Sequence, residues 1–456
     1  MKRVTNQSGS VLIAVLAILA MLALLLGSVV SYGVWHLARS RGLVSRVKAD
    51  YLAEAGINRA LALIHENPKF RTAKKREAVD SSSTFELTVV PWGGYLRVTS
   101  TGVTGRTART QQALIGMLSP EIFDNAVTLI GPPYPLVVAG NTRIVGDVAI
   151  GPAGVTAGEI RGRGYTGAKL VNGATKLVGA QDIPRFDKSA IQEFLDSVSD
   201  WHRSCPNVTD LAMVIKDPSY AKEHLEKSYR TRSAIELSLA DSGLLKIPEY
   251  LFADGKIGVG GKTHLKNILL HSEAEITISG EAFLSDCVLV GRKVTVVDGA
   301  CVSGQIFAED SITVGWHAAV SDFTFLCLTG RDQWDGIDGQ ITIASSDPAY
   351  AFAAVIPQTQ RRRDRNEPSN VNTRIRIDLN SVLHGAVWSE SYVELLGDLK
   401  GSVATNLFYY HDPPTIYLNW IVDGRVEYAR DIKATVMPMV FLVRQRLEIL
   451  RVWESD

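Results

Sequence analysis

At 456 residues the chain is longer than the ~250–300 residues that one hydrophobic core usually supports, so we expect several folded units. Its 48 basic and 48 acidic side chains give a formal net charge of zero, which excludes nucleic-acid binding through an overall positive charge. The charge is uneven, because residues 1–110 carry 15 Lys and Arg against 6 Asp and Glu. A basic region beside a membrane contacts anionic headgroups, or it is a solvated face; the sequence leaves both open.

The 38 glycines are typical of a turn-rich β-protein. The four cysteines, Cys205, Cys287, Cys301 and Cys327, form no CxxC motif. An even number of cysteines in an exported protein permits disulfides, but three of these four lie in apolar, strand-like runs. We therefore favour buried thiols over disulfide pairs.

Residues 11–35 (VLIAVLAILAMLALLLGSVVSYGVW) form an apolar run inside a segment that carries no charge between Arg3 and Arg39. About 20 apolar residues at ~1.5 Å per residue cross the ~30 Å hydrocarbon core of a bilayer. A secretory signal has a shorter apolar region, followed by a small-residue cleavage site. The run therefore predicts a single membrane-spanning helix.

The helical pattern continues beyond the apolar run. Apolar residues recur mostly three or four positions apart while charged residues fill the other faces, which predicts an amphipathic helix. This stripe consists of Val47, Tyr51, Ala55, Ile57, Leu61 and Ile64. Pro68 predicts the end of the helix. We expect one helix over residues 10–67, half in lipid and half packed on a globular domain.

Two short motifs carry a resemblance to a known family. The first is the basic leader MKRVTNQSG, which ends at Gly9 and is followed at once by the apolar helix from Ser10. The second is the string YLAEAG at residues 51–56. In this order, residues 1–66 resemble the type IV pilin-like proteins, and more narrowly the PilX N-terminal family of minor pilins and pseudopilins.

The resemblance implies that a prepilin peptidase cuts between Gly9 and Ser10, so that residues 1–9 are a leader peptide. It implies that the helix meets a head domain at four positions, Tyr51, Glu54, Ala55 and Gly56. The implied partners are other pilins or pseudopilins, the peptidase and membrane lipid, with no nucleic acid expected. The implied localisation is the inner membrane, single-pass, with the C-terminal domain in the periplasm or in an extracellular pilus.

One position departs from the family pattern. Major pilins carry a glutamate at the fifth mature position, where this chain has Ala14. In the family that carboxylate pairs with the N-terminal ammonium of a neighbouring subunit, and a charge in lipid costs several kcal/mol unless it is paired. Its absence removes a device that fixes the register between subunits. The departure favours a tip or priming subunit over a repeating shaft subunit.

The charges that flank the apolar run conflict with export. Two basic residues precede the run and four follow it, so the positive-inside rule alone would keep the C-terminal side in the cytoplasm. They are Lys2, Arg3, Arg39, Arg41, Arg46 and Lys48. We expect export, because long domains cross the membrane largely regardless of charge. The opposite orientation would suit a cytoplasmic, bactofilin-like cytoskeletal polymer.

After the helix, the polar and charged residues 70–83 predict a loop. Alternating apolar residues then flank a turn at Gly93 and Gly94, which is a hairpin signal. We expect a small antiparallel sheet over residues 84–118.

From about residue 136 the chain consists of short β-branched triplets separated by glycines, and it contains a repeat. Ile276, Val294 and Ile312 each begin such a triplet at equal spacing (294 − 276 = 18; 312 − 294 = 18). A coil of ~18 residues is what a parallel β-solenoid requires, because equivalent positions then stack ~4.8 Å apart. The texture is similar to that of bactofilin-type and other β-helical domains.

The predicted fold class is therefore α+β, mostly β: the long helix, the small antiparallel sheet, and an interrupted parallel β-solenoid over residues 136–411. Insertions are expected at residues 181–250, with a helix around residues 189–201, and at residues 330–372. Residues 412–456 would cap the solenoid, whose strand edges would otherwise be free.

No residue spacing predicts a metal or cofactor site. The nine histidines are scattered, HExxH is absent, and His264 and His271, seven apart, are a weak pair. The run at residues 361–365 (RRRDR) is typical of a solvated loop. We expect no cofactor, no metal and no enzymatic activity.

The alternative is a membrane-tethered β-helical enzyme acting on surface polysaccharide. Paired carboxylates could serve glycoside hydrolysis if they faced each other across a groove. The candidates, Asp322, Asp332, Asp335 and Asp338, lie around a glycine-spaced stretch that is equally typical of a turn. The favoured prediction is a structural subunit, a minor pilin or pseudopilin of a type IV pilus or related secretion machine, which presents the solenoid for adhesion or assembly priming.

Overall fold

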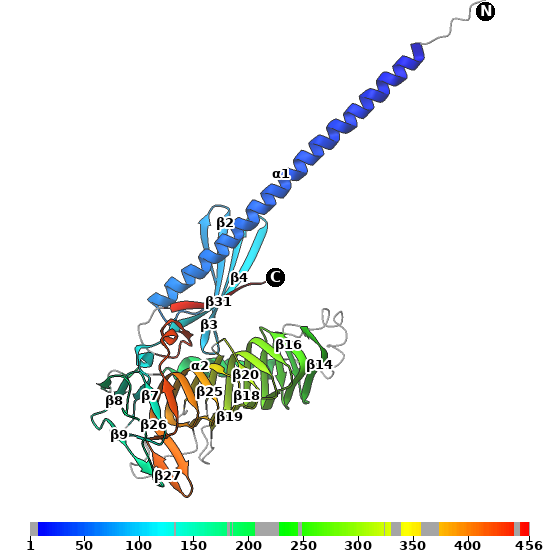
Figure 1. Ribbon diagram of the computed structural model, residues 1–456. Coiled ribbons are helices and arrows are strands. Elements are labelled where there is room, and N and C mark those ends of the chain that lie inside the picture. Colours follow the sequence, from blue (N-terminus) through cyan, green and yellow to red (C-terminus); the bar gives the residue numbers. More distant parts are fainter. Residues whose placement is uncertain are drawn as a thin grey trace, which may run out of the picture. The chain divides into compact units, whose positions relative to one another are not determined.

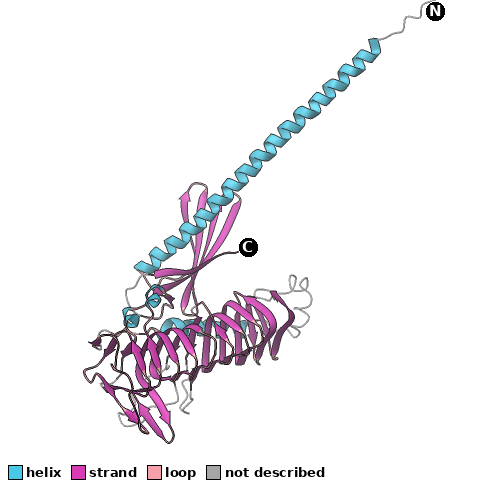
Figure 2. Ribbon diagram, in the orientation of Figure 1, coloured by secondary structure: helices cyan, strands magenta, loops and turns pink. Residues whose placement is uncertain are grey.

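The computed structural model describes residues 8–131, 134–179, 183–184, 186–205, 228–244, 249–322, 324–329, 339–356, 374–441 and 447–455. The chain divides into two compact units. One comprises Met1–Val90, Arg97–Ile115 and Ile449–Asp456, and the other comprises Pro91–Leu96 and Gly116–Glu448. The first contains a long helix and a small sheet, and the second contains a stack of short strands (Figures 1 and 2). The chain is mostly β, with one long N-terminal apolar helix.

The first unit is built on α1 (Ser8–Glu66), so the helix predicted over residues 10–67 is present. At ~1.5 Å per residue its 59 residues extend about 90 Å. Among the described residues it is the one helix long and apolar enough to cross a membrane, and its most apolar window is fully exposed. Leu24 is 75% exposed there, for example. An apolar surface of this size requires lipid or a partner protein to cover it.

Four strands follow α1 and pair in chain order: β1 (Thr72–Asp80), β2 (Ser83–Trp92), β3 (Tyr95–Thr104) and β4 (Thr107–Leu118). A strand from the far end of the chain, β31 (Leu447–Ser455), also pairs with β4. Buried residues alternate with less buried ones along most of β2 and β3, as in a sheet with one packed face. The predicted small antiparallel sheet is therefore present.

The loop predicted over residues 70–83 is wrong, because β1 occupies most of it and pairs antiparallel with β2. The charged side chains that suggested a loop form ion pairs at the surface of the sheet. Lys74 Nζ lies 3.1 Å from Glu86 Oε1, and Lys75 Nζ lies 2.9 Å from Glu77 Oε1. Charged side chains on an outer strand discourage pairing with other chains, which explains a polar strand at this position.

The second unit is a stack of mostly parallel strands whose pairings close on themselves. Its register follows the repeat seen in the sequence, because Ile276 pairs with Val294 and Val294 pairs with Ile312. The row continues to Ile341 and Ile375, and all five side chains are fully buried. Apolar side chains therefore lie over apolar side chains along the core, with backbone pairing between successive strands.

The strands in the middle of this stack are β14 (Ile235–Leu244), β15 (Tyr250–Ala253), β16 (Ile257–Lys266), β17 (Leu269–Ile278), β18 (Phe283–Val296), β19 (Cys301–Val314), β20 (Ala319–Val320), β21 (Thr324–Leu328), β22 (Gln340–Ile343), β23 (Ala349–Val355), β24 (Arg374–Ile377), β25 (Val382–Leu395) and β26 (Asp398–Asp412). Towards one end they are joined by β13 (Ser228–Thr231). Towards the other they are joined by β5 (Val127–Leu129), β7 (Arg143–Val145), β8 (Val148–Ile150), β12 (Thr175–Leu177) and β29 (Arg425–Glu427).

The order of strands in the stack differs from their order in the chain. β26 pairs with β25 along one edge and, through some of the same residues, with β29 and β5 along its other edge. β5 pairs in turn with β8, and β8 pairs with β12. The polypeptide therefore joins the stack at β5, next to β26, and continues away from β26 through β8 to β12. It then rejoins the stack towards the other end, at β13.

Helix α2 (Lys188–Ser204) lies between β12 and β13 in the chain and packs on the stack. The Phe194 ring lies 5.7 Å from that of Phe307 on β19, and the Trp201 ring lies 5.4 Å from that of Tyr250 on β15. This helix is the one expected around residues 189–201. Residues of the predicted insertion therefore pack against β15 and β19 of the stack.

The stack extends beyond the bounds predicted for it. It begins at β5 rather than at residue 136, and β13 and β14 lie inside the predicted insertion 181–250. β22 and β23 lie inside the predicted insertion 330–372, and β29 lies inside the predicted cap 412–456. The repeat was invisible there because paired positions are separated by long connections, as between Ile341 and Ile375 (375 − 341 = 34).

Candidate functional site: an apolar helix and a histidine cluster

The C-terminal part of α1 packs on the sheet of the first unit through a row of alanine and isoleucine side chains. Ala49, Ala53, Ala60 and Ile64 are fully buried, and Ile57 is 2% exposed. Three of the six residues of the predicted stripe, Val47, Tyr51 and Ala55, are instead exposed. The predicted stripe therefore holds only in part, because the face that meets the sheet runs through Ala49, Ala53 and Ile57 rather than through Val47, Tyr51 and Ala55.

Two glycines account for the close approach of helix and sheet. A Cβ on Gly56 of α1 would fall against the hydroxyl of Ser100 on β3, with Leu87 and Phe85 of β2 about 3 Å away. A Cβ on Gly102 of β3 would fall against the carbonyl oxygen of Ala49 and lie 2.6 Å from the amide nitrogen of Ala53. Both surfaces therefore lack a side chain where they meet.

The structure separates the four predicted junction residues. Gly56 lies in the contact with the sheet, whereas Tyr51, Glu54 and Ala55 lie on exposed faces of the helix. The predicted processing residues, Gly9 and Ser10, lie in the first turn of α1. The cut between them stays a prediction.

A second candidate site lies on the stack, where four segments bring together two histidines, an aspartate, a glutamate and an arginine. α2 is capped at its N-terminus by Asp187, whose carboxylate accepts from the Ser189 amide. Its buried row, Ile191, Phe194 and Val198, continues to His202, so the amphipathic pattern places this imidazole against the stack.

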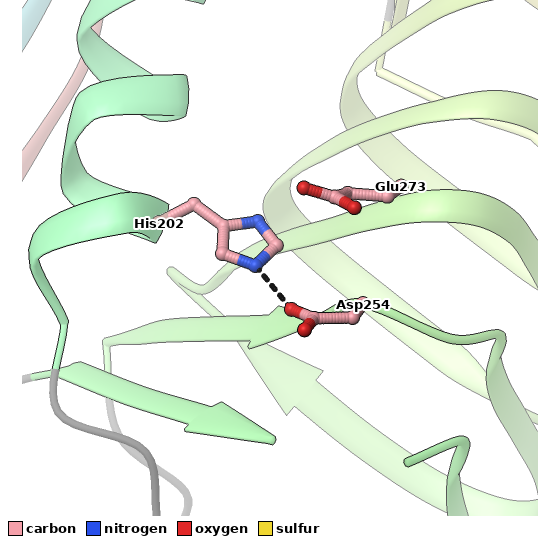
Figure 3. Close-up of side chains that lie close together, drawn as sticks. All are labelled: His202, Asp254 and Glu273. Atoms are coloured by element: carbon pink, nitrogen blue, oxygen red, sulfur yellow. Dashed lines mark hydrogen bonds and ion pairs between the residues drawn. The ribbon is translucent and has the colours of Figure 1, made fainter. Parts of the chain in front are cut away.

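The partners of His202 come from the stack. Asp254 directly follows β15, His271 and Glu273 lie on β17, and Arg230 lies on β13. Figure 3 shows the carboxylates of Asp254 and Glu273 near the imidazole of His202.

Hydrogen bonds hold both nitrogens of the His202 ring. Nε2 lies 2.7 Å from Asp254 Oδ1, and Nδ1 lies 2.7 Å from Nδ1 of His271. The Arg230 guanidinium binds the same carboxylate through both oxygens, with Nε 3.1 Å from Oδ1 and a terminal nitrogen 3.2 Å from Oδ2. The result is a hydrogen-bonded series of side chains that runs from Arg230 through Asp254 and His202 to His271.

The surroundings of Asp254 and His271 determine the charge of these two side chains. The hydrogen bond from Arg230 is the main reason that the pKa of Asp254 is lowered, with a further contribution from His202. Burial, followed by the charge of His202, lowers the pKa of His271 to about 3. Near neutral pH, Asp254 is therefore a carboxylate and His271 a neutral imidazole, which can hydrogen-bond to His202 in either direction.

A cleft of about 670 Å³ opens beside the two histidines, between α2 and the stack. Its lining is mostly polar and carries both signs of charge, with Asp196, Ser199 and Arg203 from α2 and Glu273, Arg292 and Glu309 from the stack. The cluster is thus accessible from a polar cleft.

The sequence did not indicate this cluster. His271 was weighed only with His264, and the His264 ring instead makes an edge-to-face contact with the Phe283 ring at 5.7 Å. Of the acids considered for hydrolysis, Asp322 lies in a turn with positive φ, while Asp332, Asp335 and Asp338 lie outside the described residues. The basic run at residues 361–365 also lies outside them.

Comparisons with known proteins do not identify a family for the chain. No protein-family profile matches the chain. No curated protein matches it either. Among solved structures, the chain is similar to the competence-associated pilin ComZ from Thermus thermophilus, with 11% identity, a TM-score of 0.24, and coverage of 90% of this chain and 97% of that one. A TM-score this low does not establish a shared fold.

Proposed function

We propose that this chain is a pilin-like structural subunit, a minor pilin or pseudopilin of a type IV pilus or a related secretion machine. The observation that carries the proposal is the division of α1 into two halves. The first half is apolar and exposed, and the second packs through alanine, leucine and isoleucine residues on an antiparallel sheet. One continuous helix can therefore hold the chain in a membrane and later pack against other helices.

The proposed mechanism uses α1 as an assembly stem. The stem leaves the bilayer and packs against the helices of other pilins, which then cover the apolar residues that lipid covered before. Ala14 supplies no carboxylate to pair with a neighbouring N-terminus. The subunit would therefore sit at a tip or prime assembly, rather than repeat along a shaft.

Processing at the leader tests this function directly. Mass spectrometry of the membrane-extracted protein should find Ser10 as the N-terminal residue, and Gly9→Ala should abolish the cut. Gly27→Ala is the matched control, because that glycine also lies in α1 and has open space around it. An intact Met1 in the wild type, or a cut near residue 38, would refute the proposal.

Orientation and assembly need separate measurements. Alkaline phosphatase fused to the C-terminus should be active if the second unit lies outside the inner membrane, and inactive if it lies in the cytoplasm. Co-purification with other pilins should be lost in Gly9→Ala and kept in Gly27→Ala. An exported, uncut protein that never associates with pilins would rule out the pilin function.

The parallel stack would be the part that the subunit presents, as a β-solenoid of ~18-residue coils. The register of Thr277, Thr295 and Thr313, each paired with the next, supports this. Neighbouring coils lie ~4.8 Å apart, within reach of a disulfide, whereas coils two apart (~9.6 Å) are not.

Engineered cysteines can test that register. In a Cys301→Ser background, Thr295→Cys with Thr313→Cys should oxidise to a disulfide that peptide mass spectrometry detects. Thr277→Cys with Thr313→Cys is the control and should stay reduced. Equal crosslinking of the two pairs would argue against stacked coils.

A further inference from the structure

We propose that His202, Asp254 and Glu273 form a binding site for a divalent transition metal of the zinc type. The proposal concerns the second unit alone and is independent of the pilin function. It rests on the identity, spacing and support of these three side chains.

The three residues offer a suitable set of donor atoms. One nitrogen of His202 and one carboxylate oxygen from each of the two acids all lie within 4.8 Å of one another. They come from three segments, the end of α2, the residue after β15, and β17, so the fold rather than local sequence assembles them (Figure 3). Imidazole nitrogen with carboxylate oxygen is a donor combination that zinc and its neighbours accept.

His202 and Asp254 need only a small movement to admit an ion, and the exposed Glu273 offers its oxygen from within 4.8 Å. Zinc binds imidazole nitrogen at about 2.0–2.1 Å and carboxylate oxygen at about 2.0–2.2 Å, which places two ligands of a tetrahedral ion roughly 3.3 Å apart. His202 Nε2 and Asp254 Oδ1 are now 2.7 Å apart. The ion would replace the hydrogen bond between them as they separate by about half an ångström.

Two further residues hold the first two ligands in place. His271 binds the other nitrogen of His202, and Arg230 binds both oxygens of Asp254. Metal-binding histidines and carboxylates are usually oriented in this way by a second set of hydrogen bonds. The positive charge of Arg230 opposes a cation, but the two carboxylates balance the charge of a divalent ion, so the loaded site would carry a single net positive charge.

The position of Glu273 suggests an open site. Glu273 is exposed and, like His202, lines the cleft. Three protein ligands leave one position of a tetrahedral ion for water or an incoming group. The cleft would supply both the route of entry for the ion and the space for that group.

Glu273 separates this proposal from the simpler alternative. A hydrogen bond between His202 and Asp254, supported by Arg230, would explain those residues without any metal. In that alternative Glu273 contributes only its negative charge, which helps to raise the pKa of Arg230, and Glu273→Gln would leave the hydrogen bond between His202 and Asp254 in place. A requirement for Glu273 in metal binding is therefore the decisive observation.

The test uses the full-length, untagged protein in detergent, stripped of metal with a chelator. Titration calorimetry with Zn²⁺ should show one site per chain. Glu273→Gln should weaken binding by at least about tenfold, and His202→Gln by more. Glu275→Gln is the matched control, because Glu275 lies two residues along the same strand, pairs with Lys256 at 2.9 Å, and makes the same change in charge. Its affinity should stay within about twofold of the wild type.

Co²⁺ provides a second readout, since a tetrahedral site gives strong visible absorption that Glu273→Gln should remove. Because Glu273 is exposed, this variant should fold normally, and circular dichroism would verify that. Two outcomes would overturn the proposal: no Zn²⁺ binding at concentrations up to about a millimolar, or equal affinities of Glu273→Gln and Glu275→Gln, which would indicate nonspecific binding to surface charge.

Discussion

Gly102 shows how one backbone position controls the docking of α1 on its sheet. Its absent Cβ is what allows the helix backbone at Ala49 and Ala53 to approach β3. The carbonyl oxygen of Ala49 and the amide nitrogen of Ala53 are backbone atoms, so they cannot rotate away as a flexible side chain would. The constraint therefore acts on the distance between helix and sheet.

We expect Gly102→Ala to destabilise the first unit by about 1–3 kcal/mol, the usual cost of forcing an extra carbon into a packed contact. Limited proteolysis at the end of α1 and urea unfolding would measure the change. Gly42→Ala is the control: this helical glycine has open space around it, and alanine favours a helix by up to about 1 kcal/mol. Equal effects of both substitutions would show that the close contact is unimportant.

The depressed pKa of His271 predicts how the metal-free protein responds to acid. Its value falls from an ordinary 6.5 to about 3, mainly through burial. Between these values the unfolded chain binds a proton that the folded chain excludes, so stability is complete above about pH 6.5 and falls as the pH drops towards 3. One such group contributes a slope of at most about 1.4 kcal/mol per pH unit.

His271→Gln should therefore flatten the dependence of unfolding free energy on pH between 7 and 4.5. Urea unfolding in the presence of a chelator would measure the two profiles. The absolute stability of the variant is secondary, because the slope alone reports the proton. Parallel profiles for variant and wild type would show that His271 does not titrate as proposed.

At the scale of elements, the turn between β2 and β3 depends on one side chain of the stack. Gln305 on β19 accepts a hydrogen bond from the Gly94 amide (2.7 Å) and donates one to the Trp92 carbonyl (2.9 Å). Gln305 is 3% exposed, so water cannot replace it. All three residues belong to the second unit.

Gln305→Leu should cost about 2–4 kcal/mol, because it removes both hydrogen bonds that this side chain makes to buried backbone groups. Thermal unfolding of the second unit would record the loss. Gln340→Leu, at a partly buried position where the amide donates to the hydroxyl of Thr342, is the comparison and should cost far less. A small effect at Gln305 would mean that the turn finds other partners.

The elements that could be predicted from sequence were those with a strong local period. The apolar run and its amphipathic continuation predicted α1, and a spacing of 18 residues predicted the pairing of Ile276 with Val294. β1 was missed because its charged side chains pair with neighbouring residues instead of revealing a buried face. Strands such as β13 were missed because irregular connections hide the repeat.

The histidine cluster could not have been predicted in the same way. His202 lies 52 residues from Asp254 and 69 from His271, and these distances match no local motif. Only the path of α2 across the stack brings them together. The one available signal was the position of His202, four residues beyond Val198 on the buried face of a predicted helix.

At the scale of the whole molecule, the cysteines report the integrity of the stack. The four side chains are thiols, with Cys205, Cys287 and Cys327 buried and Cys301 partly exposed. Burial raises the pKa of Cys287 to about 12 and that of Cys327 further, so neither is reactive in the folded state.

In the native protein, a thiol reagent should therefore modify Cys301 far faster than the other three cysteines. All four should react in denaturant. Counting the modified thiols with and without denaturant gives the number of reactive cysteines in the unfolded and in the native protein. Fewer than four reactive thiols in denaturant without a reductant would reveal a disulfide.

The path of the chain through the stack also determines when the stack can form. Val127 of β5 pairs with Val403 of β26, a partner that lies 276 residues later (403 − 127 = 276). During synthesis, β5, β7, β8 and β12 must therefore wait for most of the protein to be made. A nascent chain that stops before Asp398 leaves them able to pair only among themselves. The last long strand to be synthesised joins the first coils to the rest, so folding of this unit is completed only after the C-terminal region has been released.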